Sequence, residues 1–277
     1  MTSKRSIIVT GCSSGIGAHC ARRLRADGWH VFASARKRAD LERLVEGGFD
    51  AHYLDYREPD SIDSFFEQAI EACDGRLDAL FNNGGYSQPG AVEDVPAQAL
   101  REQLEANVIG WHQLARHCVQ VMRRQGHGRI VNNSSVLALV PVPLRGVYTA
   151  SKWALEGLML TMRQELAGSG IAVSQLDTGP VPSRIAVNAI AYVDKYIDVE
   201  GSVHAADYRR RLAELRAGGT GEDGGRRLDA VYRALARALN DAAPRAHYLI
   251  TSQTRAAALG KRLLPWDTLY RLLARAA

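Results

Sequence analysis

The stretch IVTGCSSGIGAHCARRL, residues 8–24, begins with β-branched residues, turns through small side chains and ends in a helix-like segment. Glycines at such a strand-to-helix turn let backbone amides approach a diphosphate, whose charge the helix N-terminus stabilises. The serines add hydroxyl donors or cap the helix. A tight turn without a ligand is the alternative, and the position directly after the first strand favours the phosphate site. The candidate cofactor-binding residues here are Gly11, Ser13, Ser14, Gly15, Ile16 and Gly17.

Outside this turn, short apolar runs alternate with amphipathic stretches. Segments such as SIIVT and GRIVNN are apolar on both faces, which is typical of parallel strands covered by helices on each side. The order predicts a single α/β domain with a doubly wound parallel sheet over residues 1–277. We expect strands at 6–10, 29–34, 51–54, 77–81, 129–134, 171–177 and 246–251, and helices at 15–27, 39–46, 60–73, 96–124, 146–167, 203–216 and 226–240.

The composition is that of an ordinary globular protein, with 46% hydrophobic and 23% charged residues. The net charge of +5 is spread along the chain without the clustering of a nucleic-acid groove, and it suits an anionic cofactor or substrate. The eight histidines form neither HxxxH nor HExxH, so we expect no metal site. The cysteines lack CxxC spacing and are expected to be reduced thiols: Cys12, Cys20, Cys73 and Cys118.

The chain begins MTSKR and enters an apolar strand by Ile7, which leaves no room for a secretory signal. No apolar run approaches the roughly 18 residues that cross a bilayer. We therefore expect a cytoplasmic protein without a transmembrane segment.

Two segments break the strand and helix alternation. Residues 184–225 form a long insertion with aliphatic and aromatic side chains, a polar helix and a glycine-rich end; this content favours a substrate lid over a solvated surface loop. Residues 252–277 form a basic amphipathic tail, which either packs on the protein's own core or makes peripheral contact with a membrane surface. We expect packing.

The second predicted strand ends FASARKR, residues 32–38. A protein that binds unphosphorylated dinucleotide uses a carboxylate at this point to hold the ribose 2′-hydroxyl. Here cations replace it, and Arg36 favours a 2′-phosphate, so the predicted cofactor is NADP. A solvated basic loop is the alternative, which is more plausible for Lys37 and Arg38 than for Arg36.

The motif YTASK puts Tyr148 and Lys152 four residues apart, on one face of a helix. An ammonium beside a phenol lowers its pKa, so the pair can move a proton. Ser135 follows the strand GRIVNNS at the edge where open α/β sheets bind ligands, and its hydroxyl could hold a substrate oxygen beside Tyr148. Asn107 lies on the apolar stripe of a long helix, where it either marks a kink satisfied by water or continues a proton path to Lys152.

Together these residues resemble the short-chain dehydrogenase/reductase family over nearly the whole chain. The resemblance is carried by TGCSSGIG (10–17), NNGG (82–85), Asn107, Ser135, YTASK (148–152) and DTGPVPS (177–183). It implies that Tyr148 is the general acid/base, that Lys152 lowers its pKa and binds the nicotinamide ribose, that Ser135 orients the carbonyl, and that Asn107 completes the relay. It also implies cofactor contacts from Asp55 to the adenine, from Asn82 and Gly84 in the cleft, and from Val181 and Ser183 to the carboxamide.

Three residues depart from the family's usual pattern. Gly84 replaces an alanine, Thr178 a proline and Ser183 a threonine. These changes are mild, although they allow a slacker nicotinamide loop.

The segments SARKRADL, DTGPVPSRI and the apolar insertion resemble the 17β-hydroxysteroid and retinol dehydrogenase branch, which implies a lipophilic alcohol or ketone as substrate. A 3-oxoacyl-thioester reductase and a non-enzymatic NADP-sensing protein are the alternatives. The resemblance further implies a homodimer or homotetramer formed through the helices at 96–124 and 146–167.

Overall fold

A computed structural model describes residues 4–181, 183–217 and 224–275. It confirms the single α/β domain: one seven-stranded sheet in the order β3-β2-β1-β4-β5-β6-β7, with every pair of neighbours parallel. The strands are β1 (Ser6–Val9), β2 (His30–Ala35), β3 (Asp50–Tyr53), β4 (Ala79–Asn82), β5 (Gly128–Ser135), β6 (Ile171–Thr178) and β7 (His247–Leu249).

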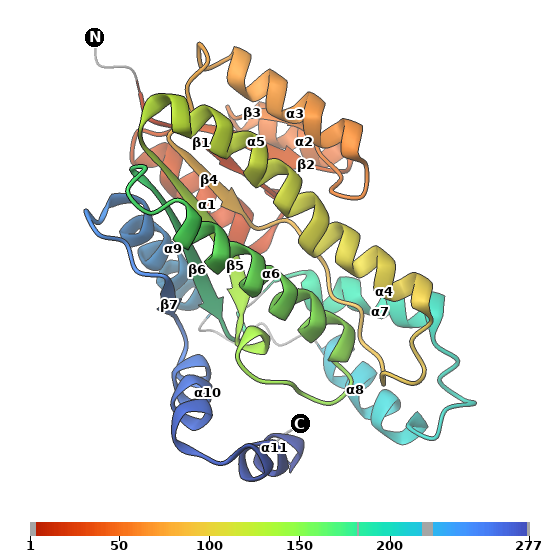
Figure 1. Ribbon diagram of the computed structural model, residues 1–277. Coiled ribbons are helices and arrows are strands. Elements are labelled where there is room, and N and C mark those ends of the chain that lie inside the picture. The colour runs from red at the N-terminus through yellow and green to blue at the C-terminus, as the bar shows by residue number, and fades with distance from the viewer. Residues whose placement is uncertain (1–3, 182, 218–223, 276–277) are drawn as a thin grey trace.

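Helices cover both faces of this sheet (Figure 1). α3, α5 and α6 lie on one face, and α1 and α9 lie on the other. The elements from α1 to α6 are α1 (Gly15–Ala26), α2 (Arg38–Glu46), α3 (Pro59–Glu71), α4 (Ala97–Leu104), the π-helical turn η1 (Glu105–Ile109), α5 (Gly110–Gln125), the 3-10 turn η2 (Val136–Ala138) and α6 (Gly146–Glu165), and α9 spans Gly224–Asn240.

The strands are apolar on both faces because each face has its own core. In register across the sheet, Ile8 lies between Phe32 and Leu80, and this row packs against α3, α5 and α6. The alternating residues Ile7 and Val9 face α1 and α9 instead. Since successive strand side chains point to opposite faces, a run without polar residues is what a doubly covered strand requires.

The insertion contains two helices, α7 (Ile185–Tyr196) and α8 (Ala205–Ala217). The sequence indicated α8, whereas α7 was not recognised as a helix. Both contribute to a small apolar cluster in which Val193, Tyr208 and Leu212 are buried. Tyr208 donates a hydrogen bond to Asp94 (2.9 Å) and accepts one from the amide of Ala91 (2.7 Å). The described part of the insertion is therefore packed, while most of its glycine-rich end lies outside the described residues.

The tail forms α10 (Ser252–Leu263) and α11 (Trp266–Arg275), and the expectation that it packs on the core was largely wrong. Leu269 is buried, but most of the apolar side chains that motivated the expectation are exposed. Two short helices joined at a proline reach past the sheet, so only one side of them finds protein to contact. Among the described residues, no helix combines the length and apolar character needed to cross a membrane.

Candidate active site

The glycine-rich turn between β1 and α1 depends on glycine at three positions. Gly11 and Gly15 adopt φ of +68° and +57°, which L side chains rarely reach. Gly17 has an ordinary conformation, but a Cβ on it would lie 2.3 Å from the carbonyl oxygen of Gly11. The first two glycines therefore shape the turn, and the third lets α1 begin directly against it.

The N-terminus of α1 has the character of an anion site. Ser14 occupies the N-cap position but forms no side-chain capping hydrogen bond, and the first turn carries no acidic residue. Ser13 is exposed beside it, whereas Ile16 packs against the core below. An exposed hydroxyl, an uncapped helix start and the absence of nearby acidic residues suit a diphosphate, so the residues present fit a dinucleotide.

At the end of β2, Arg36 is half-exposed and its guanidinium lies 3.7 Å from the Asp55 carboxylate. The closer partner of Asp55 is Arg57, which donates to both carboxylate oxygens at 2.7 and 3.1 Å. Burial alone would raise the pKa of Asp55, but the hydrogen bonds and charge of Arg57 outweigh it and the net pKa is lowered. Arg57 thus holds Asp55 in its ionised form. Arg36 is more exposed to solvent than Arg57.

The ends of β1 and β4 are joined by a buried polar network that sequence inspection missed. Tyr56 donates to the Asn82 side-chain oxygen (2.7 Å), its oxygen lies 3.0 Å from the Thr10 hydroxyl, and Thr10 accepts from the amides of Asn83 and Gly84. A Cβ on Gly84 would meet the backbone of Gly11 at 3.2 Å. This network fixes the spacing between the glycine-rich turn and the NNGG segment.

The loop after β6 carries the remaining cofactor candidates. Thr178, at the end of the strand, donates to the carbonyl of Ser134 at 2.9 Å and so ties β6 to β5. Val181 packs against the same core cluster as α1, and Ser183 is partly buried shortly before α7. Both side chains therefore lie at the edge of the sheet that carries the glycine-rich turn.

Ser135, Tyr148 and Lys152 come together at the carboxyl end of β5. Ser135 is the last residue of the strand and its hydroxyl accepts from the amide of Leu137 at 3.1 Å. Tyr148 and Lys152 lie on α6, with the Lys152 ammonium 5.6 Å from the centroid of the Tyr148 ring. The sequence motif and the strand end thus meet in one place.

Lys152 is buried and donates to the carbonyl oxygen of Asn133 at 2.9 Å. Its ammonium also lies 4.4 Å from the centroid of the Trp111 indole. Burial lowers the pKa of Lys152 to about 7, although the nearby carboxylates of Glu156 and Asp177 oppose the shift. Because this pKa lies near neutrality, the protonation of Lys152 responds to any further negative charge placed beside it.

Burial dominates at Tyr148 as well, and it raises the pKa of the phenol to about 12. Interaction with the Ser135 hydroxyl and the positive charge of Arg145 lower it. The cation that lowers the pKa of this phenol is therefore Arg145, which the sequence analysis did not single out. The lowering of the Tyr148 pKa by Lys152 remains a prediction.

Arg145 precedes Tyr148 by three residues and occupies the N-cap position of α6 without a side-chain capping hydrogen bond. Its guanidinium donates to the Ser87 hydroxyl at 3.3 Å, and no carboxylate of the described residues lies within 4.0 Å of it. Burial and the nearby Arg211 lower the pKa of Arg145 to about 10, so it is charged at neutral pH. No local pattern marks this residue, because its surroundings come from distant segments.

Asn107 lies within the π-helical turn η1, which interrupts the long helix expected at 96–124. Its amide accepts from the Tyr86 backbone N–H (3.2 Å) and donates to the Tyr86 carbonyl (2.9 Å). The structure shows a π-helical turn at this position, and protein backbone satisfies the amide. Such turns recur at functional sites because they re-aim a side chain within a helix.

Behind Lys152 lies a second cluster that sequence inspection missed, formed by Glu156, Asp177 and His247. The His247 ring approaches Asp177 at 2.9 Å and Glu156 at 3.2 Å. Burial raises the pKa of Glu156 to about 7, and hydrogen bonding to Asp177 raises the pKa of His247. The three ligand-capable atoms lie within 4.8 Å of one another. Because both ring nitrogens already face carboxylates, we interpret them as a proton-sharing group rather than a metal site.

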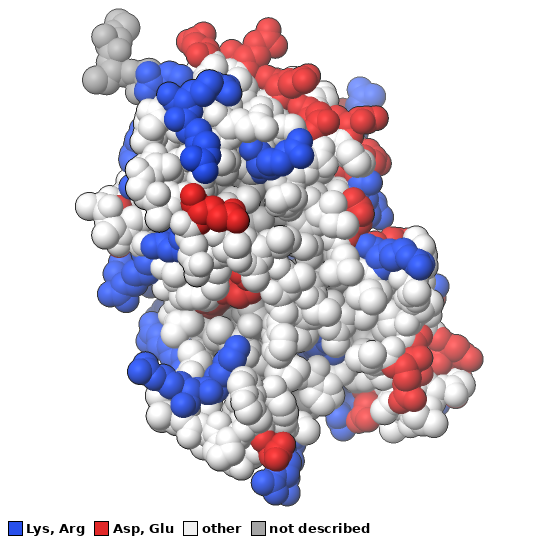
Figure 2. All heavy atoms as spheres, viewed as in Figure 1, with Lys and Arg blue, Asp and Glu red and all other residues white. Residues whose placement is uncertain are grey.

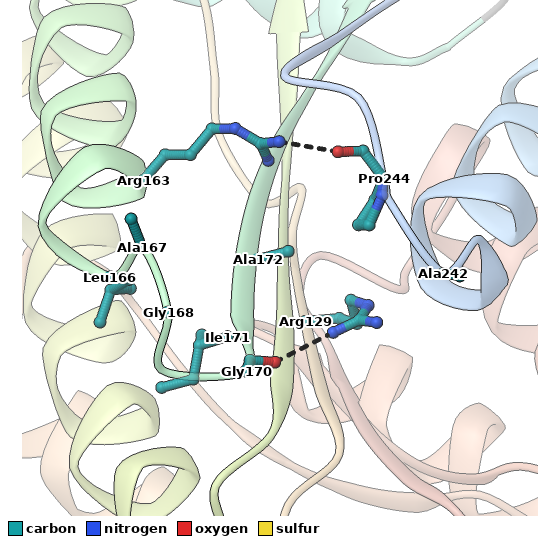
Figure 3. Close-up of a pocket in the computed structure, with 10 residues that line it drawn as sticks. All are labelled: Arg129, Arg163, Leu166, Ala167, Gly168, Gly170, Ile171, Ala172, Ala242 and Pro244. Carbon is teal, nitrogen blue, oxygen red and sulfur yellow. Dashed lines mark hydrogen bonds between the residues drawn. The ribbon is translucent and has the colours of Figure 1, made fainter.

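A cavity of about 330 Å³ lies at the opposite edge of the sheet, near the starts of β5 and β6 (Figure 3). Its arginines are held by backbone carbonyls: Arg163 donates to Pro244 at 2.7 Å and Arg129 to Gly170 at 3.3 Å. The cavity is remote from the glycine-rich turn and from Tyr148, so it is separate from the candidate site.

Comparisons with known proteins agree with this geometry. Residues 5–192 match the family model described as short chain dehydrogenase. The chain is 34% identical to the uncharacterized oxidoreductase YbbO of Escherichia coli, over 98% of this chain and 94% of the relative. It is 32% identical to human 17-beta-hydroxysteroid dehydrogenase type 1, over 69% of this chain and 61% of that protein.

A solved short-chain dehydrogenase from Streptomyces avermitilis superposes with a TM-score of 0.77 at 26% identity, covering 98% of both chains. The family match and the shared fold thus agree over most of the chain. The protein belongs to the short-chain dehydrogenase/reductase family and is an oxidoreductase.

Proposed function

We propose that the protein transfers a hydride between NADP(H) and a lipophilic alcohol or ketone, with Tyr148 as general acid/base. The observation that carries the proposal is the meeting of the Tyr148 phenol with the Ser135 hydroxyl and the Lys152 ammonium at the end of β5. That edge of an open α/β sheet is where ligands bind.

In the direction of reduction, Ser135 holds the carbonyl oxygen and Tyr148 donates the proton to it. Bound nicotinamide would supply the hydride. Lys152 holds the nicotinamide ribose and stabilises the phenolate left on Tyr148. Asn107, whose amide is bonded to the backbone of Tyr86, completes the proton relay to Lys152.

Arg36 supports the choice of NADP over NAD. It is half-exposed at the end of β2, where a carboxylate would otherwise hold the ribose 2′-hydroxyl. When the cofactor is bound, Asp55 would face the adenine, Asn82 and Gly84 would line the cleft, and Val181 and Ser183 would meet the carboxamide. The serines and glycines of the turn would hold the diphosphate.

The insertion supports a lipophilic substrate. Tyr192 of α7 stacks on Tyr86 with the ring centroids 4.2 Å apart, and the apolar cluster around Val193 continues behind them. Aromatic and aliphatic walls suit burial of a hydrophobic body, so we propose that α7 and α8 form the lid over the substrate.

We also propose that two copies pair through α4, α5 and α6. Ile109 and Leu158, on the segments expected to pair, are 50% and 44% exposed. A helix face with large apolar side chains in water gains free energy when a second copy covers it.

The decisive experiment compares wild type with Tyr148→Phe in a screen of hydrophobic ketones, following loss of reduced-nicotinamide absorbance. We expect turnover to fall by roughly 10³-fold or more while NADPH affinity stays within about threefold, because only the proton donor is removed. Tyr270→Phe in α11 is the matched control and should leave the rate unchanged.

Wild-type-like rates in Tyr148→Phe would overturn the mechanism. Tight NADPH binding without turnover of any alcohol or carbonyl would favour an NADP-sensing protein instead. An excess of acyl-carrier thioester that inhibits ketone reduction would favour the thioester reductase. Tighter binding of NADH than NADPH would remove the role given to Arg36.

A further inference from the structure

The two C-terminal helices expose several large apolar side chains that a helix packed on the core would bury. Leu263 is 67% exposed, Leu259 58%, Trp266 53% and Leu272 51%. In α11 only Leu269 is buried, and the substantial contacts of α11 are with α10. We call α10 and α11 together the tail surface. Contiguous apolar side chains of this kind mark a surface that something else covers.

The tail surface also carries most of the protein's net charge. Residues 252–277 contain five basic side chains and one carboxylate, which accounts for four of the five net positive charges of the whole chain. The basic residues are exposed, and none is ion-paired with another described residue. They are Arg255, Lys261, Arg262, Arg271 and Arg275.

Figure 2 shows how the charged side chains lie around the tail surface. At the end of the molecule where Figure 1 places α10 and α11, uncharged surface is bordered by Lys and Arg, with little Asp or Glu. Apolar side chains flanked by cations are what a helix lying in a membrane interface presents, with the apolar face among acyl chains and the cations at the headgroups.

The tail surface lies close to the candidate active site. α10 packs beside η2, which directly follows Ser135. Lys261 lies 5.6 Å from the centroid of the Trp153 ring, and Trp153 donates to the carbonyl of Leu137 in η2 at 2.9 Å. Whatever covers α10 and α11 therefore sits at the same end of the sheet as Tyr148.

We propose that α10 and α11 dock the protein on a membrane surface that contains anionic lipids. At 12 and 10 residues, the helices are too short to span a bilayer and must lie in its plane. A second copy of the chain fits less well, because a two-fold interface through this surface would bring two groups of net charge +4 together. An anionic lipid surface meets both the apolar and the basic side chains.

The experiment measures co-sedimentation of the full chain with vesicles of phosphatidylcholine alone and of phosphatidylcholine with 30% phosphatidylglycerol. We expect binding to the anionic vesicles that weakens with added salt. Each basic residue near such a surface adds roughly fivefold to binding, so Lys261→Gln with Arg262→Gln should weaken it roughly 25-fold. The matched control is Arg123→Gln with Arg124→Gln, two adjacent exposed arginines on α5.

A second pair tests the apolar face. Leu263→Gln with Trp266→Gln should reduce binding at least tenfold and abolish any blue shift of tryptophan fluorescence on vesicle addition, whereas Val45→Gln on exposed α2 should change neither. Circular dichroism checks that all variants fold.

Absence of vesicle binding by wild type, equal loss in the control variants, or a fall in oligomer mass for Leu263→Gln with Trp266→Gln would overturn the proposal. The readout needs no turnover, so it stands or falls separately from the proposed reaction.

Discussion

Two cations on α6 flank the Tyr148 phenol, and their surroundings differ. Lys152, one turn after it, has Glu156 and Asp177 nearby with His247 between them. The guanidinium of Arg145, three residues before it, donates to the Ser87 hydroxyl and has no carboxylate of the described residues within 4.0 Å. Lys152 is thus backed by a cluster of two carboxylates and a histidine, whereas the carboxylate that acts on Arg145, Glu214, is itself paired with Arg211.

The difference follows from chemistry. An amine loses its proton readily when buried, so Lys152 needs carboxylates to stay charged, whereas guanidinium stays charged without them. Lys152 is therefore the adjustable charge, sensitive to pH and to the groups behind it. Arg145 is the constant one, on the side of Tyr148 that faces the insertion.

The largest effect is expected from removing the adjustable charge. Lys152→Met should lower kcat/KM for ketone reduction by roughly 10³-fold and weaken NADPH binding as well, because the phenolate and the ribose lose the same partner. Steady-state kinetics with nucleotide titration measure both. If kcat falls while the NADPH Kd is unchanged, Lys152 does not hold the ribose.

A smaller effect is expected from the cluster behind Lys152. Glu156→Gln removes a charge that raises the pKa of Lys152, so that pKa should drop below its present value of about 7. Lys152 is charged below its pKa, so the loss of kcat/KM should be roughly tenfold at pH 8 and close to none at pH 6. Glu165→Gln, exposed on the same helix, is the control. A loss independent of pH would indicate a purely structural role for Glu156.

The smallest effect is expected from the constant charge. Arg145→Met removes a cation that lowers the pKa of Tyr148, so the phenol should ionise at higher pH. Alcohol oxidation needs the phenolate and should slow roughly three- to tenfold at fixed pH, with its pH profile displaced upward. Arg145→Lys should restore the profile. An unchanged profile in Arg145→Met would show that Arg145 does not act on Tyr148.

Much of the site could be predicted because its parts are local in the chain. The glycine-rich turn is a single strand-to-helix connection, and YTASK places Tyr148 and Lys152 on one helix face through the period of the helix itself. The doubly covered strands follow from apolar runs without alternation. The π-helical turn at Asn107 was harder to foresee, because it depends on the Tyr86 backbone, which comes from a loop 21 residues away.

The tail shows the limit of pattern alone. Its leucines and arginines predict an amphipathic helix equally well whether the apolar face is buried or exposed. Only the position of α10 beside η2, with α11 contacting mainly α10, decided that this face stays open. The Glu156, Asp177 and His247 cluster was likewise invisible in sequence, since Asp177 and His247 are 70 residues apart.

The sequence by itself determined the family, the glycine-rich turn, the Tyr148 and Lys152 pair and the order of strands along the chain, because motifs and spacings that are local in the chain encode each of them. The tertiary structure decided which charges surround that pair and which apolar faces remain uncovered. Those properties arise when β5, β6, β7 and α6 bring distant side chains together, and burial then sets how strongly each charge acts.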